Sequence, residues 1–147
     1  ILAENYLKNL KRYLIIRTNF TGKKKNTFIN SVIKNIRNKK IINLFHDMYT
    51  STLDVKTCAS LIVKLCLLRS KGIYNLGSRD MVSKERFAIG IAKIMKKKIK
   101  FQSLSCQMLN VPRGKNLGLN VNKIEKKLGF RMPTSNKSMI NLVEEYK

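Results

Sequence analysis

Three side chains with binding chemistry follow a short apolar run near the start of the chain. Residues 13–16 are large apolar or aromatic residues, two of them β-branched, a pattern typical of a strand buried on both faces of a parallel sheet. Thr18, Asn19 and Phe20 come directly after this run and before Gly22. Ligands of open α/β sheets bind at the loops that leave the carboxyl ends of strands. We therefore expect these three side chains to line a ligand site.

Other reactive or aromatic side chains have a plainer interpretation beside the functional one. The Arg113 guanidinium suits bidentate recognition of a phosphate, although a solvated role is commoner for a loop arginine. Phe20 could stack on a ring or belong to the core, and the pattern alone favours neither. His46 is the only histidine and stands beside Asp47, but no nucleophile is tied to it, which favours a structural role over proton transfer.

The sequence lacks the patterns of a complete oxidoreductase site. No GxGxxG follows a strand, and the pair Gly72 and Gly77 is not followed by the Lys-Ser/Thr of a phosphate-binding loop. None of the tyrosines has a lysine four positions later, and the acidic residues are scattered, which argues against a metal site. We therefore assign no catalytic residue and no metal ligand within this chain.

Strands are predicted to alternate with helices. The predicted helices cover 1–10, 27–38, 54–68, 83–95, 121–128 and 136–146, and the predicted strands cover 13–16, 41–45, 72–77 and 98–103, with a loop over 104–120. Asn26 or Thr27 can cap the second helix, and Gly129 is placed to end the fifth. The third helix is apolar nearly all round and is expected to be buried between layers. This alternation predicts an α/β layer architecture.

Composition narrows the class of protein. The 147 residues are 44% hydrophobic, enough for one domain with a core, and they contain no apolar run of membrane-spanning length and no signal peptide. The formal charge is +23, yet the lysines are spread along the chain, with clusters only at 23–25 and 96–98. This argues against a dedicated nucleic-acid function, which we keep as the alternative from a different class. An odd number of cysteines without a CxxC pair predicts a reduced, cytoplasmic protein.

The first ten residues have apolar positions at helical spacing, but no N-cap residue precedes them. We therefore expect this helix to begin upstream of Ile1, and the chain to be a fragment of a longer protein.

Several segments carry motifs that are weak alone but specific in their order. They are Ile15-Ile16-Arg17-Thr18-Asn19-Phe20-Thr21-Gly22, Asn26-Thr27-Phe28, the segment from Asp47 to Ala59, Gly72-Ile73-Tyr74-Asn75-Leu76, the segment from Ser83 to Ala88, and Arg113-Gly114-Lys115-Asn116 with Leu119-Asn120. Together they resemble the C-terminal half of the extended short-chain dehydrogenases/reductases, in particular the dTDP-4-dehydrorhamnose reductases. Residues 1–4 look like the helix that follows the Tyr-x-x-x-Lys of that family.

The resemblance implies a fold, an activity and a set of site residues. Residues 1–147 would be the C-terminal part of an NAD(P)-binding Rossmann-type fold with a small α/β substrate-binding subdomain, without its N-terminal cofactor-binding part. The parent protein would use NADPH or NADH to reduce a 4-keto-6-deoxy sugar nucleotide, with its Tyr/Lys pair upstream of Ile1, and the fragment alone would be inactive. The implied site residues are Thr18 and Asn19 for the cofactor and Phe20, Asn26, Phe28 and Arg113 for the nucleotide-sugar substrate. The resemblance also allows a homodimer.

The chain departs from the family pattern at three positions. Thr52 stands where the family usually has proline, Gly114 replaces the proline after Arg113, and Phe20 stands where the rhamnose reductases often have tryptophan. The change at Phe20 leaves the sugar preference open, and the sequence does not indicate the nucleotide or the choice between NADH and NADPH. A nucleotide-sugar epimerase or dehydratase of the same superfamily, and a redox-inactive structural homologue, remain as alternatives.

Overall fold

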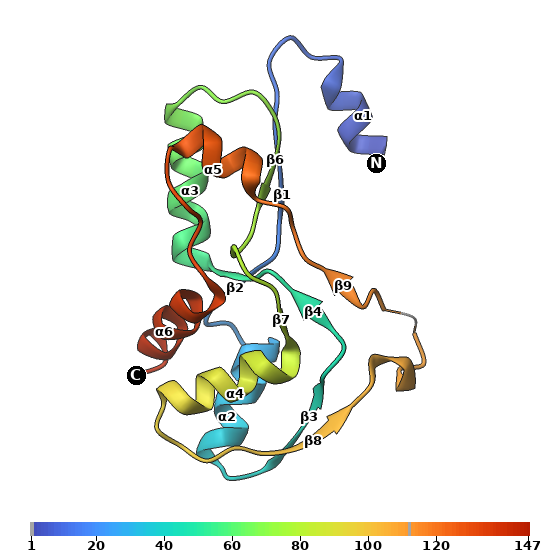
Figure 1. Ribbon diagram of the computed structural model, residues 1–147, viewed down its shortest axis with the longest axis vertical. Coiled ribbons are helices and arrows are strands. Elements are labelled where there is room, and N and C mark those ends of the chain that lie inside the picture. The colour runs from blue at the N-terminus through green and yellow to red at the C-terminus, as the bar shows by residue number, and fades with distance from the viewer. Residues whose placement is uncertain (1, 112) are drawn as a thin grey trace.

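The computed structural model describes residues 2–111 and 113–147. In chain order the elements are α1 (Leu2–Lys8), β1 (Leu14–Thr18), β2 (Phe20–Thr21), α2 (Phe28–Arg37), β3 (Ile41–Phe45), β4 (Tyr49–Thr50), β5 (Leu53–Asp54), α3 (Val55–Leu67), β6 (Gly72–Leu76), β7 (Val82–Ser83), α4 (Lys84–Ile94), β8 (Lys100–Leu104), the 3₁₀ turn η1 (Cys106–Met108), β9 (Asn116–Leu117), α5 (Asn122–Leu128) and α6 (Ser135–Glu145). Figure 1 shows two lobes along the longest axis. Within the described residues, no helix combines the length and apolarity needed to cross a bilayer.

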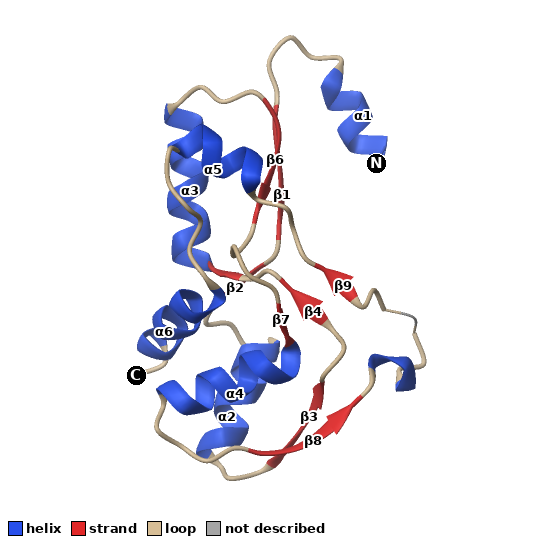
Figure 2. Cartoon of the chain, in the orientation of Figure 1, coloured by secondary structure: helices blue, strands red, loops and turns tan. Residues whose placement is uncertain are grey.

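The parallel strands β1 and β6 form the centre of the first lobe. Leu14 lies opposite Gly72 and Thr18 lies opposite Leu76. The connection between the two strands passes through α2 and β3 of the second lobe before α3 leads into β6. The helices α3 and α5 lie on one side of this pair and α1 lies on the other (Figure 2). The core under α3 and α5 consists of Leu53, Cys58, Leu61, Leu65, Tyr74, Leu76, Val121, Ile124 and Met132. Because β1 and β6 are parallel, the loop after β1 leaves from the carboxyl edge of the pair.

The second lobe packs helices against another parallel pair, β3 and β8. The apolar stripe of α2 repeats at helical spacing, and its Ile29, Val32, Ile33 and Ile36 are all buried. These residues form one core with Ile42, Leu44, Phe87, Ala88, Ile91, Ala92, Met139, Leu142, Val143 and Tyr146. The helices α2, α4 and α6 thus share one core that rests on β3.

Short strands join the lobes. Phe20 of β2 lies opposite Leu53 of β5 in a parallel pair, so the loop after β1 runs beside the start of α3. Strand β4 pairs antiparallel with β7 and parallel with β9. These pairings bring the starts of α2, α3 and α4 to the junction of the two lobes (Figure 1).

The helices α2, α3 and α4 begin at side-chain caps, and α5 ends at a glycine. The Thr27 Oγ1 accepts a hydrogen bond from the Asn30 backbone N–H at 3.2 Å, whereas Asn26 lies before the cap with a left-handed φ of 60°. Asp54 and Ser83 cap α3 and α4 in the same way. Gly129 ends α5 with a φ of 75°, a conformation that favours glycine. The α/β architecture and the predicted helices are confirmed, although the first helix ends at Lys8 rather than at residue 10, and Ile1 of that prediction lies outside the described residues.

Two sequence-based predictions about burial were wrong. Leu14, Ile15 and Ile16 of β1 are only half-buried, because in the described part of the chain β1 has β6 as its single partner strand and its second face is thinly covered. Helix α3 is not buried all round, since Val63 and Leu67 are 57% and 78% exposed. The predicted loops also contain the two-residue strands β2, β4 and β9, which are too short to show a period in the sequence.

Candidate functional site

A cavity of about 410 Å³ lies at the junction of the two lobes. It is lined by Asn19, Phe20, Thr21, Gly22, Lys23, Lys24, Thr27, Phe28, Ile29, Thr50, Thr52, Val55, Lys84 and Phe87. The carboxyl end of β1 therefore opens into a concave site, the position where open α/β sheets bind ligands.

The elements around the cavity fix its walls. The segment after β1 is held in place because the Leu53 N–H donates to the Asn19 carbonyl at 3.1 Å. Gly22 passes so close to α3 that an added Cβ would lie 2.7 Å from Val55 Cγ1, so a larger residue there would have to displace the Val55 side chain. On the far side, the buried Phe87 of α4 belongs to the core of the second lobe and also lines the cavity.

The aromatic residues provide most of the apolar lining. Phe20 is 55% exposed, so its ring has a free face at the cavity. Phe28 is half-buried at the first position of α2. An exposed ring beside a partly covered one gives a surface on which the apolar face of a ring-shaped ligand can pack.

Hydroxyl groups form a second, polar part of the lining. The buried Thr52 donates its hydroxyl proton to Thr50 Oγ1 at 3.0 Å, which leaves the Thr50 hydroxyl proton for another acceptor. The Thr27 hydroxyl is already used, because it donates to the Lys24 carbonyl at 2.9 Å and accepts from the Asn30 N–H. Thr50 is therefore the better placed of these hydroxyls to contact a ligand.

The charged groups on the cavity wall are all lysines. Lys23 and Lys24 are exposed on the loop that leads into α2. Lys84 is partly buried, and burial lowers the pKa of its ammonium group. Its Nζ lies 4.9 Å from the centroid of the Phe28 ring. The site therefore carries positive charge beside an aromatic surface.

The structure brings together three of the six predicted site residues. Asn19, Phe20 and Phe28 line one cavity. Thr18 lies at the end of β1, where its Oγ1 is 3.6 Å from Cys58 Sγ. Asn26 and Arg113 are exposed and do not line the cavity. The roles of all six residues stay predictions.

Lys84, Thr50, Thr52 and Val55 were not predicted as site residues. The signal for Lys84 was present, because Ser83 is a recognisable cap and the next residue must lie in the first turn of α4. The convergence of that turn with β2 and α2 depends on tertiary packing, which the sequence pattern does not show.

The pair His46–Asp47 does not build a catalytic centre. Asp47 accepts hydrogen bonds from the Cys106 N–H at 2.8 Å and from the Ser105 hydroxyl at 2.7 Å, and these lower the pKa of its carboxyl to about 2. His46 is exposed, with its Nδ1 3.3 Å from the Ser103 Oγ. Asp47 thus holds the turn η1 in place. In the described residues, His, Cys, Asp and Glu form no cluster of three suited to a metal ion.

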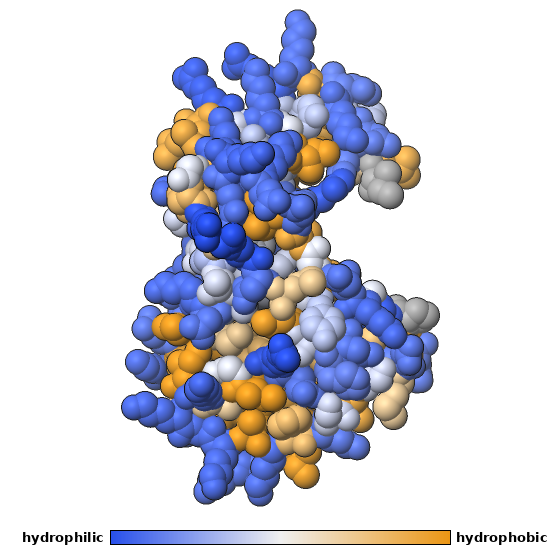
Figure 3. Space-filling model, in the orientation of Figure 1, coloured by the Kyte–Doolittle hydropathy of each residue, from blue (hydrophilic) through white to orange (hydrophobic). Residues whose placement is uncertain are grey.

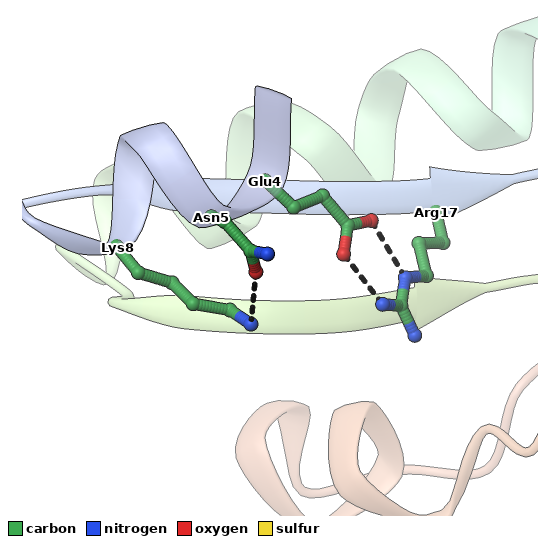
Figure 4. A network of polar contacts seen from close by, with 4 residues as sticks. All are labelled: Glu4, Asn5, Lys8 and Arg17. Atoms are coloured by element: carbon green, nitrogen blue, oxygen red, sulfur yellow. Dashed lines mark hydrogen bonds and ion pairs between the residues drawn. The ribbon is translucent and has the colours of Figure 1, made fainter. Parts of the chain in front are cut away.

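Arg17 of β1 does not line the cavity and pairs with a carboxylate of α1. Its Nε donates to Glu4 Oε1 at 2.8 Å and its Nη2 donates to Glu4 Oε2 at 2.6 Å (Figure 4). This paired hydrogen bond lowers the pKa of the Glu4 carboxyl. Arg17 therefore ties α1 to the outer face of β1.

Comparison with known proteins gives one family match. The family described as the RmlD substrate binding domain matches residues 2–147. No curated protein sequence matches the chain significantly.

Solved structures share the fold. The dTDP-4-dehydrorhamnose reductase from Bacillus anthracis, described as in complex with NADP, superposes with a TM-score of 0.85 at 24% identity and covers 98% of this chain. The corresponding reductase from Yersinia enterocolitica gives 0.84 at 18% identity over 98% of this chain. A dTDP-glucose 4,6-dehydratase from Bacillus anthracis, in complex with NAD, gives 0.79 at 16% identity over 99% of this chain. The chain spans about half of each structure: 52%, 52% and 48% of their lengths.

Proposed function

Because the chain belongs to the family of RmlD substrate-binding domains, we propose that it forms the substrate-binding half of an NAD(P)H-dependent reductase of nucleotide sugars. The family match confirms the resemblance derived from the sequence. The reaction and its substrate are our proposal, namely reduction of a 4-keto-6-deoxy sugar carried on a nucleoside diphosphate.

The cavity after β1 is the observation that carries this proposal. It combines an exposed aromatic ring, Phe20, with a half-buried one, Phe28, and with the Thr50 hydroxyl. A 6-deoxyhexose has an apolar face and a methyl group that suit the rings, and hydroxyls that suit Thr50. The lysines on the same wall suit the negative charge of a diphosphate.

The residues of this chain fit one wall of a nicotinamide site. Asn19 lines the cavity directly after β1, so we assign it to the contact between the nicotinamide and the sugar. Thr18 ends β1 outside the cavity lining, beside Cys58, and stays the second predicted cofactor residue. The sequence contains no GxGxxG after a strand, so the dinucleotide phosphates would be bound by other residues of the parent protein. NAD(P)H, when bound, would supply the hydride. The part played by this chain is to position the sugar and to keep the cavity apolar around it.

Calorimetric titration of the chain tests the substrate class. We expect the tightest binding for a dTDP-linked 6-deoxyhexose, weaker binding for thymidine diphosphate, and the weakest for the free sugar. Equal affinity for the nucleotide sugar and for thymidine diphosphate would mean that the sugar contributes nothing to binding, and it would contradict the proposal.

A dehydratase or epimerase of the same superfamily is the second candidate function. The match to the dTDP-glucose 4,6-dehydratase favours keeping it, since its fold superposes over nearly the whole chain. These enzymes regenerate their cofactor, whereas a reductase consumes NAD(P)H in step with its product. Stoichiometric consumption by a protein that joins this chain to a cofactor-binding half supports the reductase. Turnover without net consumption supports the alternative.

Two further parts of the proposal concern the whole protein. We expect a cytoplasmic location, and a homodimer remains a prediction that sedimentation of the complete protein would test. Neither affects the substrate-binding assignment.

A further inference from the structure

The wall of the cavity carries an unbalanced positive charge. Lys23, Lys24 and Lys84 line it, and among the described lining residues there is no carboxylate. The first turn of α2 contributes Phe28 to the same wall and contains no acidic residue, so the positive end of its helix dipole adds to the charge. The cavity therefore attracts anions more strongly than its apolar area alone would suggest.

Lys84 differs from the other cavity lysines because it is partly buried. Its ammonium rests on the Phe28 ring, with 4.9 Å between Nζ and the ring centroid. Lys23 is exposed, and its Nζ lies 5.5 Å from the ring centroid of Tyr146. Lys84 is thus the cation that a ligand inside the cavity would meet.

In the described part of the chain the Lys84 ammonium has no ion-pair or hydrogen-bond partner. Other lysines do have one: Lys56 pairs with Glu145 at 3.4 Å, and Lys123 donates to the Ile73 carbonyl at 2.8 Å. Withdrawing an ammonium from water without a counter-charge is costly, which is why burial lowers the pKa of Lys84. An aromatic ring offsets only part of that cost.

We infer that Lys84 is the anion-binding residue of this cavity, and that the substrate places an anionic oxygen against its ammonium. The inference deepens the proposed function and rests on it for the identity of the ligand. Two sources share this chemistry: a phosphate of the nucleoside diphosphate, which the proposed substrate carries, and the carboxylate of a uronic acid, which it lacks. The ring of Phe28 would fix the direction of the ammonium toward the bound group.

The test compares Lys84→Met with Lys93→Met in the full 147-residue chain. Lys93 lies on the exposed face of the same helix, so both variants lose one positive charge. The probes are inorganic pyrophosphate, thymidine diphosphate, a dTDP-linked hexose and free glucuronate, titrated at a salt concentration of roughly 0.15 M to screen the overall charge. Methionine keeps the packing of the lysine stem on Phe28.

Loss of one charged hydrogen-bond donor should weaken binding of the phosphate probes by roughly 10-fold or more in Lys84→Met, against a change below about 2-fold in Lys93→Met. Selective weakening of glucuronate instead would identify a carboxylate as the source. Equal binding by Lys84→Met and the unchanged chain would overturn the inference. Thermal unfolding without ligand verifies the fold, and Lys84→Gln replaces the methionine variant if that variant fails to fold.

The outcomes separate this inference from the proposed function. If the unchanged chain binds the nucleotide sugar best and Lys84→Met binds it equally well, the inference fails and the function stands. If pyrophosphate binding depends on Lys84 but the sugar adds nothing to affinity, the inference stands and the function fails. Absence of binding by any probe contradicts both.

Discussion

At the scale of single residues, the candidate site is defined by what each side chain leaves unused. Phe20 keeps a free ring face, Thr50 keeps a hydroxyl proton, and the Lys84 ammonium has no counter-charge in the described structure. Asp54, in contrast, is fully buried and engaged, because it caps α3 and accepts from the Asn141 side-chain amide at 3.0 Å. Groups without interaction partners that face one cavity are typical of a binding site, whereas groups that already have hydrogen-bond partners serve the fold.

Replacement of Phe20 by alanine should separate binding from stability. Because the ring is 55% exposed, its loss should change the free energy of unfolding by less than about 0.5 kcal/mol. Binding of the nucleotide sugar should weaken by about 1–2 kcal/mol, since the ring is an aromatic anchor of the cavity. Phe101→Ala is the control, because that residue is also exposed, at 38%, and does not line the cavity. Calorimetry and thermal unfolding measure the two effects, and equal binding by both variants would remove Phe20 from the site.

Asp47 gives a prediction about pH and stability. Its carboxyl has a pKa of about 2 in the folded chain against an ordinary value of 3.8, because the charged form accepts from Cys106 and Ser105. A lowered folded-state pKa stabilises the protein above the ordinary pKa, and this stabilisation is lost as the pH falls from about 4 toward 2. As the pH is lowered over this range, the free energy of unfolding of the unchanged chain should therefore fall more than that of Asp47→Asn. If the free energy of unfolding fell equally with pH in the two proteins, these hydrogen bonds would not favour the charged carboxyl.

At the scale of elements, cap residues and helical periodicity predicted the helices reliably, whereas an apolar sequence did not reliably predict burial. The α2 stripe and the caps Thr27 and Ser83 follow from local chemistry that a sequence displays. The short strands β2 and β4 form through pairing with distant segments, so their sequences carry no period. Asn19 and Phe20 were predicted from their place after the strand, and Phe28 from the family resemblance, and all three line the cavity. Lys84 and Thr50, supplied by other elements, were not predicted. Local signals locate a site on its own loop, and tertiary packing selects the opposite wall.

Helix α3 tests how far an apolar sequence implies burial. Leu65 is fully buried, whereas Leu67, two residues later, is 78% exposed. Leu65→Ala should lower the free energy of unfolding by about 2–5 kcal/mol through loss of core packing. Leu67→Ala should change it by less than about 0.5 kcal/mol, because the side chain already contacts water. Urea unfolding of both variants measures this difference, and a large loss in Leu67→Ala would mean that this face of α3 is covered in solution.

At the scale of the whole molecule, the charge of +23 is distributed over both lobes rather than gathered at the cavity. Hydrophilic side chains cover most of the face drawn in Figure 3, with apolar groups in separate areas between them. Several lysines lie at helix ends, where Lys39 and Lys96 adopt left-handed backbone conformations just after α2 and α4. Cations at the C-terminal ends of helices interact favourably with the helix dipoles. Such an arrangement raises the attraction for any anion without defining a second specific site.

The distribution of charge leads to a prediction about salt that distinguishes the two classes of partner. A molecule with this net charge should retain duplex DNA at low salt, without sequence preference, and lose it by roughly 0.2 M salt as counterions compete. Binding of a nucleotide sugar should survive at that salt, because the Phe20 and Phe28 rings and the partly buried Lys84 are screened less than exposed lysines. Fluorescence anisotropy with labelled DNA and calorimetry with the nucleotide sugar, measured over the same salt series, show how steeply each affinity falls with salt. Tight, sequence-dependent retention of DNA at roughly 0.2 M salt, with no binding of the nucleotide sugar, would instead favour a nucleic-acid-binding domain.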